Sequence, residues 1–312
     1  METRTIGPLE VSLVGLGCNN FGRRIDAAET ERVVRASLDA GITLFDTADV
    51  YGDRRSEEQL GAALAGRRDE AVVATKFGME LDEQRRGAHP DYVRTACEDS
   101  LRRLDTDHID LYQLHRPDPD VPIEETLGAL DELIAAGKVR AIGHSNLSAE
   151  QMDAAEAAGR TMTAARFVSA QDRWNLLERD LEDEQLPAIE RNGLAVLPYF
   201  PLASGLLTGK YRAGEDPDPA WRIATLPDDR RQTQLADDRL ATVERLRGFA
   251  EARGRSLLEL AFSWLAAQPV VASIIAGATR PEQVASNVDA VGWELTDDEL
   301  EEIDRLTGRG RS

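Results

Sequence analysis

Eight short apolar runs alternate along the chain with amphipathic stretches of helical spacing, and this alternation limits the fold more than any other feature. The runs lie near residues 13–17, 42–45, 71–75, 109–114, 139–143, 167–170, 194–198 and 272–276. Strands that alternate with helices are typical of a parallel α/β sheet, and eight such units close into a barrel. We therefore expect a single (β/α)8 TIM barrel domain over residues 1–312.

Two segments outside this repeat are expected at the two ends of the barrel. Residues 5–12 predict an N-terminal β-hairpin that plugs the bottom, with its turn at Gly7 and Pro8. Residues 203–236 form a long loop after the seventh strand, rich in Gly, Pro, Asp and Arg and with little periodicity. Such long structureless loops are usually functional or disordered, so we expect a lid or substrate loop.

Several helix starts carry recognisable signals. Capping-box spacing, in which the first side chain and the residue three positions later satisfy each other's backbone amides, occurs at Asp26 with Glu29, Ser56 with Gln59, and Ser148 with Gln151. Proline is expected at the first helical position at Pro90 and Pro281.

Composition excludes several classes of partner. The chain has 57 acidic residues against 37 Lys and Arg, a formal net charge of −20, so a nucleic acid is not expected as a partner. Its two cysteines are too few for a disulfide framework, and Cys97 falls in an apolar stripe typical of a core residue. No signal-peptide pattern and no run of about 18 apolar residues occurs, so we expect no membrane contact and a cytoplasmic location.

Polar side chains follow the apolar runs, at the face where barrel enzymes place their active sites. Asp46 and Tyr51 follow the second run, Lys76 ends the third and His115 the fourth. Each has a structural alternative when taken alone, as a capping acid, a surface aromatic, a rim lysine or a core histidine. Lysine occurs only at positions 76, 138 and 210, and arginine supplies nearly all other positive charge. An exposed structural role at the barrel rim is therefore a less convincing explanation for Lys76.

These four side chains can donate a proton to a carbonyl without a metal. A free tyrosine has a pKa of about 10, and a nearby lysine is expected to lower the pKa of Tyr51. Asp46 would keep Lys76 charged, and His115 would orient the carbonyl oxygen. A nicotinamide cofactor is the expected hydride source. No GxGxxG pattern opens a helix after the first strand, so the last barrel helix is the expected phosphate anchor.

Six segments together closely resemble the aldo-keto reductases, and the resemblance runs essentially from end to end. They are FDTADVYG (45–52), ATKFG (74–78), DLYQLHRPD (110–118), GKVRAIGHSN (137–146), PYFPLASGLLTGKY (198–211) and GATRPEQVASN (277–287). The resemblance implies NAD(P)H-dependent reduction of aldehydes or ketones, or the reverse oxidation of an alcohol or sugar.

The resemblance also implies roles for individual residues. Tyr51 would be the general acid, tuned by Lys76 and Asp46, and His115 would orient the substrate. The nicotinamide carboxamide would bind Ser145, Asn146 and Gln171, and Tyr199 would stack on the ring. The adenosine end would be held by the segment that contains Gly277, Thr279, Arg280, Gln283 and Asn287. Arg280 is the natural partner of a 2′-phosphate, which favours NADPH, with NADH as the alternative.

The sequence departs from the family pattern at several positions. Gly277 and Gln283 stand where the best-known members carry a lysine and an arginine, which weakens the preference for NADP over NAD. Asp172 stands where a neutral asparagine is more usual, and we expect a surface-loop charge, the alternative being a bias against anionic substrates. Lys210 is expected either to reach a cofactor phosphate or to remain an exposed loop charge. The pocket walls are expected from residues 18–25, 78–89 and 203–236, with apolar contributions from Phe21, Phe77, Trp174 and Trp221.

Two other functions compete with a carbonyl reductase. One is a slow NADPH-binding regulatory or sensor protein of the same fold. The other is an isomerase or lyase that forms a Schiff base on Lys76.

Overall fold

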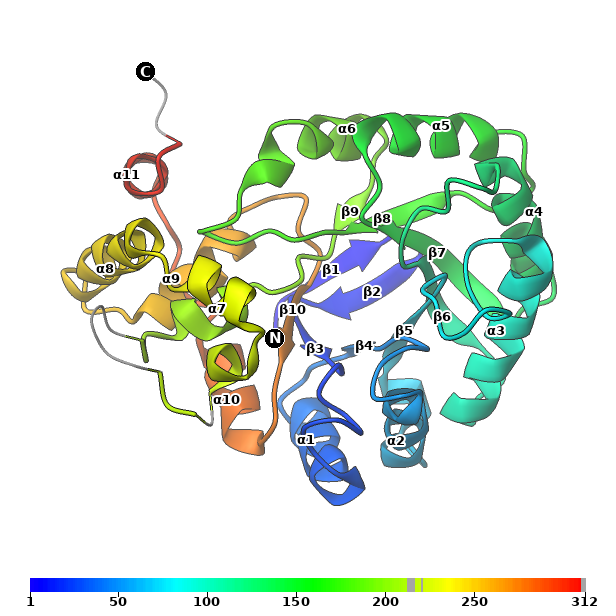
Figure 1. The fold of residues 1–312 in the computed structure, drawn as a ribbon, viewed down its shortest axis with the longest axis horizontal. Coiled ribbons are helices and arrows are strands. Elements are labelled where there is room, and N and C mark those ends of the chain that lie inside the picture. Colours follow the sequence, from blue (N-terminus) through cyan, green and yellow to red (C-terminus); the bar gives the residue numbers. More distant parts are fainter. Residues whose placement is uncertain (212–216, 220, 310–312) are drawn as a thin grey trace.

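Eight parallel strands form one sheet in the computed structural model, which describes residues 1–211, 217–219 and 221–309. The strands are β3 (Val14–Gly17), β4 (Leu44–Asp46), β5 (Val72–Phe77), β6 (Ile109–Leu114), β7 (Val139–Ser145), β8 (Phe167–Gln171), β9 (Ala195–Val196) and β10 (Ile274–Gly277). Chain order is kept from β3 to β9, and β10 pairs with β3. Isolated parallel bridges join Val196 to Val271 and Tyr199 to Ile275, so the arrangement fits a closed (β/α)8 barrel (Figure 1).

Helices surround this sheet (Figure 1). They are α1 (Ala27–Asp39), α2 (Arg55–Ala63), α3 (Pro90–Leu104), α4 (Ile123–Ala135), α5 (Ala149–Gly159), α6 (Gln185–Arg191), α8 (Asp237–Glu251), α9 (Leu257–Ala266), α10 (Pro281–Asp289) and α11 (Asp297–Leu306), with single turns η1 (Arg68–Glu70) and η2 (Asp180–Glu182). The buried face of α3 contains Val93, Cys97 and Leu101, which confirms Cys97 as a core residue. Within the described residues, none of the helices is both long and apolar enough to cross a bilayer.

Most of the predicted helix starts are confirmed. Ser148 and Gln151 form the predicted reciprocal capping box. At Asp26 half of the predicted box is found, because its side chain accepts from the amide of Glu29 at 2.9 Å but no return bond from the Glu29 side chain is present among the described residues. Helices α3 and α10 begin at Pro90 and Pro281.

The capping box predicted at Ser56 and Gln59 is wrong. Helix α2 begins at Arg55, two residues before the start that a cap at Ser56 would give, and Ser56 lies inside the helix. The buried Ser56 hydroxyl donates to the carbonyl of Cys18 at 2.9 Å and shares a hydrogen bond with Thr47 Oγ1 at 2.8 Å. Tertiary partners at the strand ends therefore replace the local backbone partner.

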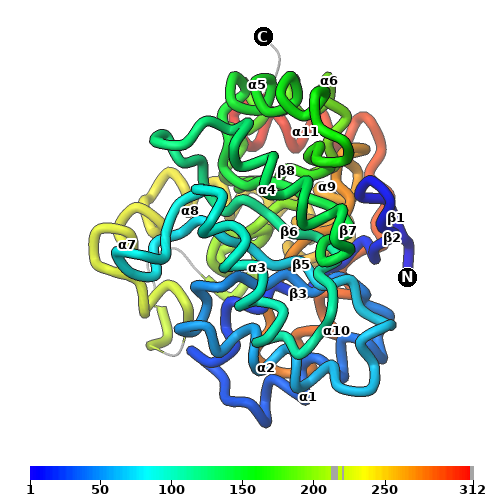
Figure 2. The backbone as a smooth tube through the Cα atoms, turned by 90° about the vertical axis from the view of Figure 1, so that its right-hand side faces the viewer, coloured from blue at the N-terminus to red at the C-terminus, as the bar shows by residue number. Residues whose placement is uncertain are grey.

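The N-terminal hairpin is confirmed as strands β1 (Thr3–Ile6) and β2 (Leu9–Ser12), which pair antiparallel around Gly7 and Pro8. Its apolar side chains close one end of the barrel interior, because they share a buried cluster with residues of the strands. The cluster contains Ile6, Leu9, Val11, Leu44, Ala74, Leu111, Ala141, Leu197, Ala272 and Ile275. Figure 2 shows the hairpin on the opposite side of the molecule from α7 (Asp228–Gln234).

Residues 203–236 are more regular than predicted. They contain η3 (Ala203–Thr208), η4 (Arg222–Thr225) and the helix α7, although residues 212–216 and 220 lie outside the described residues. Sequence periodicity did not reveal these elements because each spans two turns or fewer. Ala203 and Ser204 adopt left-handed φ angles of 45° and 57°, a costly conformation for residues with a side chain. The chain thus turns sharply where it leaves the barrel.

Candidate active site

A cavity of about 800 Å³ lies at the carboxyl ends of the strands and holds nearly all of the predicted site residues. Its lining includes Asp46, Tyr51, His115, Ser145, Asn146, Gln171, Tyr199, Gly277, Thr279, Arg280, Gln283 and Asn287. Lys76 is fully buried immediately behind this lining, where it contacts Asp46. The structure therefore brings all thirteen predicted residues to one site, divided between two ends of the cavity.

Lys76 and Asp46 form a buried ion pair at the ends of β5 and β4. The Lys76 ammonium donates to both oxygens of Asp46 at 2.7 Å and to the carbonyl of Thr47 at 2.8 Å. Burial alone would lower the pKa of Lys76, but Asp46 and Tyr51 outweigh it and raise that pKa. Lys76 is consequently a buried cation held in place by several acceptors.

Amide side chains complete the surroundings of Asp46. Gln171 donates to Asp46 Oδ1 at 2.7 Å, and Gln113 donates to the same oxygen at 3.3 Å. Gln113 was not among the predicted site residues, although its place on β6, two residues before His115, is the signal that could have revealed it. Because the Gln171 amide already donates to Asp46, its carbonyl oxygen is the atom left to accept from a ligand.

Tyr51 reaches this pair from the turn that follows β4. The turn depends on Gly52, which has a φ of 58° and whose missing Cβ would lie 2.4 Å from the carbonyl oxygen of Phe21. The Lys76 ammonium lies 5.2 Å from the centre of the Tyr51 ring. His115 stands edge-on to the same ring, with 5.8 Å between ring centres. Tyr51 thus lies between the Lys76–Asp46 pair and His115, and the four residues predicted for catalysis form one cluster.

The electrostatics of Tyr51 differ from the prediction in their net direction. Burial raises the pKa of the Tyr51 phenol, Lys76 lowers it, and Asp46 raises it again, so that the pKa stands above its ordinary value. The expected influence of Lys76 is present, but desolvation of the phenolate outweighs it. In this state Tyr51 is a protonated phenol, the form that a proton donor requires.

His115 is uncharged at neutral pH. Burial, and then the charges of Lys76 and Arg116, lower its pKa to about 3. Its Nδ1 atom is buried and has no hydrogen-bond partner in the described part of the chain. A neutral imidazole offers one N–H donor, which suits the predicted task of orienting a carbonyl oxygen.

A second hydrogen-bonded group lies at the ends of β7 and β8. Ser145 Oγ donates to the carbonyl of Gln171 at 2.6 Å, and the Asn146 amide donates to Ser145 Oγ at 2.8 Å and to the carbonyl of His115 at 3.1 Å. The Tyr199 hydroxyl donates to Asn146 Oδ1 at 2.9 Å. These contacts fix the polar groups predicted to hold a carboxamide and orient the Tyr199 ring beside them.

The expectation that Asp172 is a surface charge is wrong. Asp172 is 4% exposed, and its Oδ1 accepts the backbone N–H of Asn146 at 2.9 Å. Its Oδ2 is buried with no hydrogen-bond partner among the described residues, and burial raises the pKa of this carboxyl to about 7. Asn146 has a left-handed φ of 63°, so Asp172 stabilises an unusual backbone conformation.

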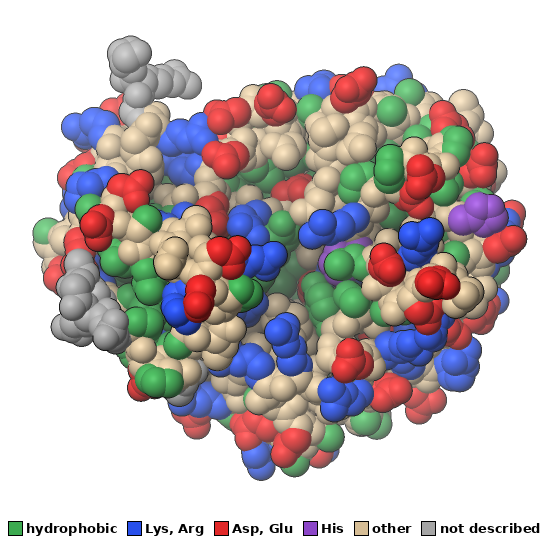
Figure 3. Space-filling view, in the orientation of Figure 1, with side chains coloured by type: hydrophobic (Ala, Val, Ile, Leu, Met, Phe, Trp, Pro, Cys, Tyr) green, Lys and Arg blue, Asp and Glu red, His purple; other side chains and the backbone are tan. Residues whose placement is uncertain are grey.

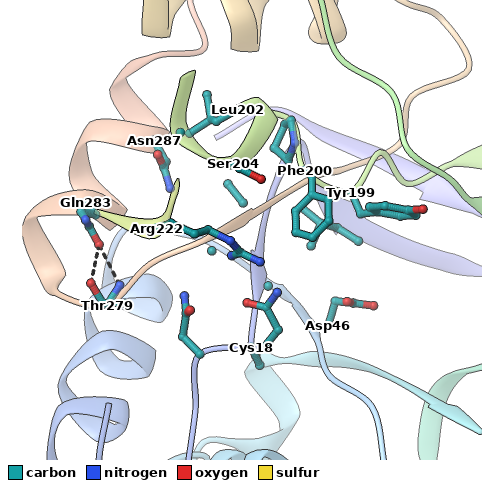
Figure 4. A pocket seen from close by; sticks show the side chains of 18 of the residues that line it. Cys18, Asp46, Tyr199, Phe200, Leu202, Ser204, Arg222, Thr279, Gln283 and Asn287 are labelled. Atoms are coloured by element: carbon teal, nitrogen blue, oxygen red, sulfur yellow. Dashed lines mark hydrogen bonds between the residues drawn. The ribbon is translucent and has the colours of Figure 1, made fainter. Parts of the chain in front are cut away.

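The start of α10 forms the other end of the cavity. Gln283 Oε1 accepts from the amide and the hydroxyl of Thr279, at 2.7 and 3.0 Å, which Figure 4 shows as two dashed lines. Arg280 precedes the first residue of the helix, and the buried Asn287 lies two turns further along. Gln283 is therefore engaged within the protein, whereas Arg280 makes no ion pair with any described residue.

The walls of the cavity agree only in part with the prediction. Residues of the segments 18–25 and 203–236 line it, including Cys18, Arg24 and Trp221, but no residue of 78–89 does. Phe21, Phe77 and Trp174 are buried in the core and are not part of the lining. Their side chains point into the packing between elements, a direction that the sequence did not reveal.

The chain is similar to known proteins over nearly its whole length. Residues 13–307 match the aldo/keto reductase family. The aldo-keto reductase YhdN of Bacillus subtilis (strain 168) is 37% identical over 315 residues, which cover 96% of this chain and 90% of that protein. A probable voltage-gated potassium channel subunit beta of Oryza sativa subsp. japonica is 35% identical, covering 93% of this chain and 91% of the other. The solved structure of a glycerol dehydrogenase from Gluconobacter oxydans superposes with a TM-score of 0.85 at 36% identity, covering 98% of this chain and 95% of that one.

Proposed function

Because the chain belongs to the aldo/keto reductase family, and is therefore an oxidoreductase that acts on carbonyl or alcohol groups, we propose that it uses NADPH and Tyr51 to reduce an aldehyde or ketone. The reverse oxidation of an alcohol or sugar would use the same groups. The observation that carries this proposal is the contact of Tyr51 with the buried Lys76–Asp46 pair and with the neutral His115. The proposal treats residues 1–312 as one catalytic domain and retains a cytoplasmic location.

The cavity fits a nicotinamide dinucleotide. It is large enough for such a ligand and joins the Tyr51 cluster to the start of α10, where backbone amides favour phosphate. Lys210 lines it, and burial together with the charges of Arg24 and Arg280 lowers the pKa of this lysine. Cations that crowd together at a cost in free energy are stabilised by a bound anion, which favours a 2′-phosphate and therefore NADPH over NADH. When bound, the nicotinamide supplies the hydride for the carbonyl carbon.

The side chains of this protein would then orient and protonate the carbonyl. Ser145, Asn146 and the side-chain oxygen Oε1 of Gln171 would hold the carboxamide of the nicotinamide, and Tyr199 would lie against the nicotinamide ring. The substrate oxygen would accept from His115 and from the Tyr51 hydroxyl, whose proton completes the alcohol. Lys76 lies close enough to stabilise the phenolate that remains, and Asp46 keeps Lys76 charged.

The Schiff-base alternative does not agree with the geometry of Lys76. A lysine nucleophile needs a free amine lone pair, whereas Lys76 is 0% exposed, carries a raised pKa and donates three hydrogen bonds. The slow regulatory alternative keeps the cavity and differs from the proposal only in turnover.

The test is NADPH oxidation measured across a panel of aldehydes for the native chain, Tyr51→Phe and Tyr112→Phe. Tyr112 is a matched control, because its buried hydroxyl has no partner among the described residues and lies outside the cavity. We expect Tyr51→Phe to lower kcat by roughly 10²–10⁴-fold and Tyr112→Phe to change it little. Equal activity of the native chain and Tyr51→Phe would refute the role of Tyr51, and tight NADPH binding without turnover of any carbonyl would favour the regulatory alternative.

A further inference from the structure

The charge of the cavity is opposite to that of the chain as a whole. The chain has a formal net charge of −20, yet the described lining of the cavity contains one acid, Asp46, and seven cations. The cations are Arg24, Arg116, Arg173, Lys210, Arg222, Arg230 and Arg280. Asp46 is already paired with Lys76, so the cavity has a net positive lining. Figure 3 shows Lys and Arg side chains around the central hollow of this face.

Most surface arginines of this protein pair with acids, whereas several cavity cations do not. Arg94, for example, pairs with both Asp91 and Glu132. In the cavity, Arg173 pairs with Glu178, but neither Arg116 nor Arg222 makes an ion pair or donates a hydrogen bond to a described residue. In a chain with so many carboxylates, cations without partners in a cavity indicate a site for an anion that comes from outside.

Arg116 lies at the reacting end of the cavity. It follows His115 directly in the sequence. Its positive charge contributes to the low pKa of His115 and also works to lower the pKa of Tyr199. Its side chain is exposed, so it can reach a ligand without first losing a partner. The guanidinium therefore stands beside the residue proposed to orient the substrate carbonyl.

Arg222 reaches the Tyr51 end of the cavity from the 203–236 segment. Its guanidinium lies 4.8 Å from the centre of the Phe200 ring, and Figure 4 shows the side chain extended across the pocket from the loop that carries it. Burial and the charges of Arg24 and Arg23 lower its pKa, while Tyr51 raises it, which places the guanidinium within electrostatic range of the phenol. Arg116 and Arg222 thus face the reacting end from β6 and from the 203–236 segment.

We propose that the carbonyl substrate carries an anionic group, a carboxylate or a phosphate, which Arg116 binds and Arg222 helps to attract. The inference rests on the proposed carbonyl reduction and names its substrate class. Both anions suit the planar fork of a guanidinium, and the long arginine side chain leaves several ångströms between the anion and the carbonyl. Asp172 does not oppose such a substrate, because its carboxyl faces the Asn146 backbone and is not part of the cavity lining.

Two pairs of aldehydes test the proposal, each differing in charge. Succinic semialdehyde is compared with butanal, and glyceraldehyde 3-phosphate with glyceraldehyde, by measuring kcat/KM with saturating NADPH. We expect at least one anionic aldehyde to exceed its neutral counterpart by about 10- to 100-fold, since a charge-assisted hydrogen bond carries that much discrimination. The pair that shows the effect distinguishes a carboxylate from a phosphate. Raising NaCl from about 20 to about 200 mM should reduce only the anionic rate.

Two variants locate the effect. Arg116→Gln should remove most of the preference for the anion, because it should raise the KM of the anionic aldehyde much more than the KM of its neutral counterpart. Arg222→Gln should raise the KM of the anion while the KM of NADPH stays within about twofold. Arg102→Gln is the control, because it removes the same charge from the exposed surface of α3.

Three results would overturn the inference. Neutral aldehydes reduced as efficiently as both anionic ones would exclude the substrate class, yet leave carbonyl reduction intact. An unchanged anion preference in Arg116→Gln would remove that residue from the substrate site, and a rise confined to the KM of NADPH would assign Arg222 to the cofactor. Failure of the proposed function is a separate outcome, in which no aldehyde of either charge is reduced.

Discussion

Two buried acids lie at the same end of the barrel in opposite electrostatic surroundings. Asp46 at the end of β4 is 3% exposed, and Asp172 directly after β8 is 4% exposed. Asp46 accepts two hydrogen bonds from Lys76 and others from Gln171 and Gln113. Asp172 accepts one, from the Asn146 backbone, and its second oxygen has no partner in the described structure.

The difference between Asp46 and Asp172 shows that burial alone does not determine how much free energy a buried carboxylate takes from the stability of the fold. A buried carboxylate is tolerated when a cation and hydrogen-bond donors replace its water, as they do around Asp46. Around Asp172 a single neutral donor among the described residues does so, and the pKa of that carboxyl rises to about 7. The acid beside Tyr51 is therefore part of a buried ion pair, whereas the acid behind Asn146 is balanced between two protonation states near neutral pH.

The largest change is expected from removal of the Asp46 partner. Lys76→Met would leave the Asp46 charge buried without a cation and should lower the free energy of unfolding by about 3–5 kcal/mol. Denaturant unfolding at pH 7 measures the loss. The double variant Asp46→Asn/Lys76→Met should recover part of it, because no charge is then left unpaired. A Lys76→Met protein as stable as the native chain would contradict this account of the pair.

Asp172→Asn should raise the free energy of unfolding, whereas Lys76→Met should lower it. The asparagine keeps an acceptor for the Asn146 amide but removes the poorly solvated charge, so at pH 8 the free energy of unfolding should rise by roughly 1–3 kcal/mol. Asp46→Asn is the matched comparison at the same burial and should destabilise. If both variants destabilise, the contrast between the two acids is wrong.

The gain from Asp172→Asn should also depend on pH. The folded pKa of about 7 lies above the usual value near 3.9, so between these values the folded chain binds more protons than the unfolded one. Stability from this group is therefore present below about pH 4 and is lost as the pH rises to about 7. The difference between Asp172→Asn and the native chain should grow as the pH rises from about 4 to about 7 and should be largest at pH 8. A difference that does not change with pH would show that Asp172 does not titrate in this range.

The smallest effect is expected at the outer partners of Asp46. Gln113→Leu removes a 3.3 Å hydrogen bond but leaves Lys76 and Gln171 in place, so its cost should be about 1 kcal/mol. Thermal unfolding of Gln113→Leu and of Lys76→Met would show how much each partner of Asp46, the neutral Gln113 amide and the Lys76 cation, contributes to stability. A cost equal to that of Lys76→Met would mean that the amide network, rather than the ion pair, stabilises Asp46.

The sequence identified this site because of a geometric regularity. The carboxyl ends of parallel strands meet at one face, so residues that follow successive apolar runs, such as Asp46, Lys76 and His115, must lie near one another. Local turn and capping signals placed the N-terminal hairpin at Gly7 and Pro8 and the N-cap of helix α5 at Ser148. These features depend on the local sequence pattern and on the order of the elements, and both can be read directly from the sequence.

Other features depend on which groups fold against one another. Ser56 has the spacing of a cap but bonds to Thr47 and Cys18, and Asp172 has the sequence context of a loop but is buried. The short elements of residues 203–236 have no periodicity to detect. The pKa of Tyr51 is set by burial together with Lys76 and Asp46. Whether Arg116 and Arg222 find an acidic partner among the described residues depends on where the carboxylates lie after folding. The sequence by itself determined the barrel and the residues that converge on one face. Only the tertiary structure decided their charge states and the positive cavity, because desolvation and charge pairing depend on distances between segments that are remote in the chain.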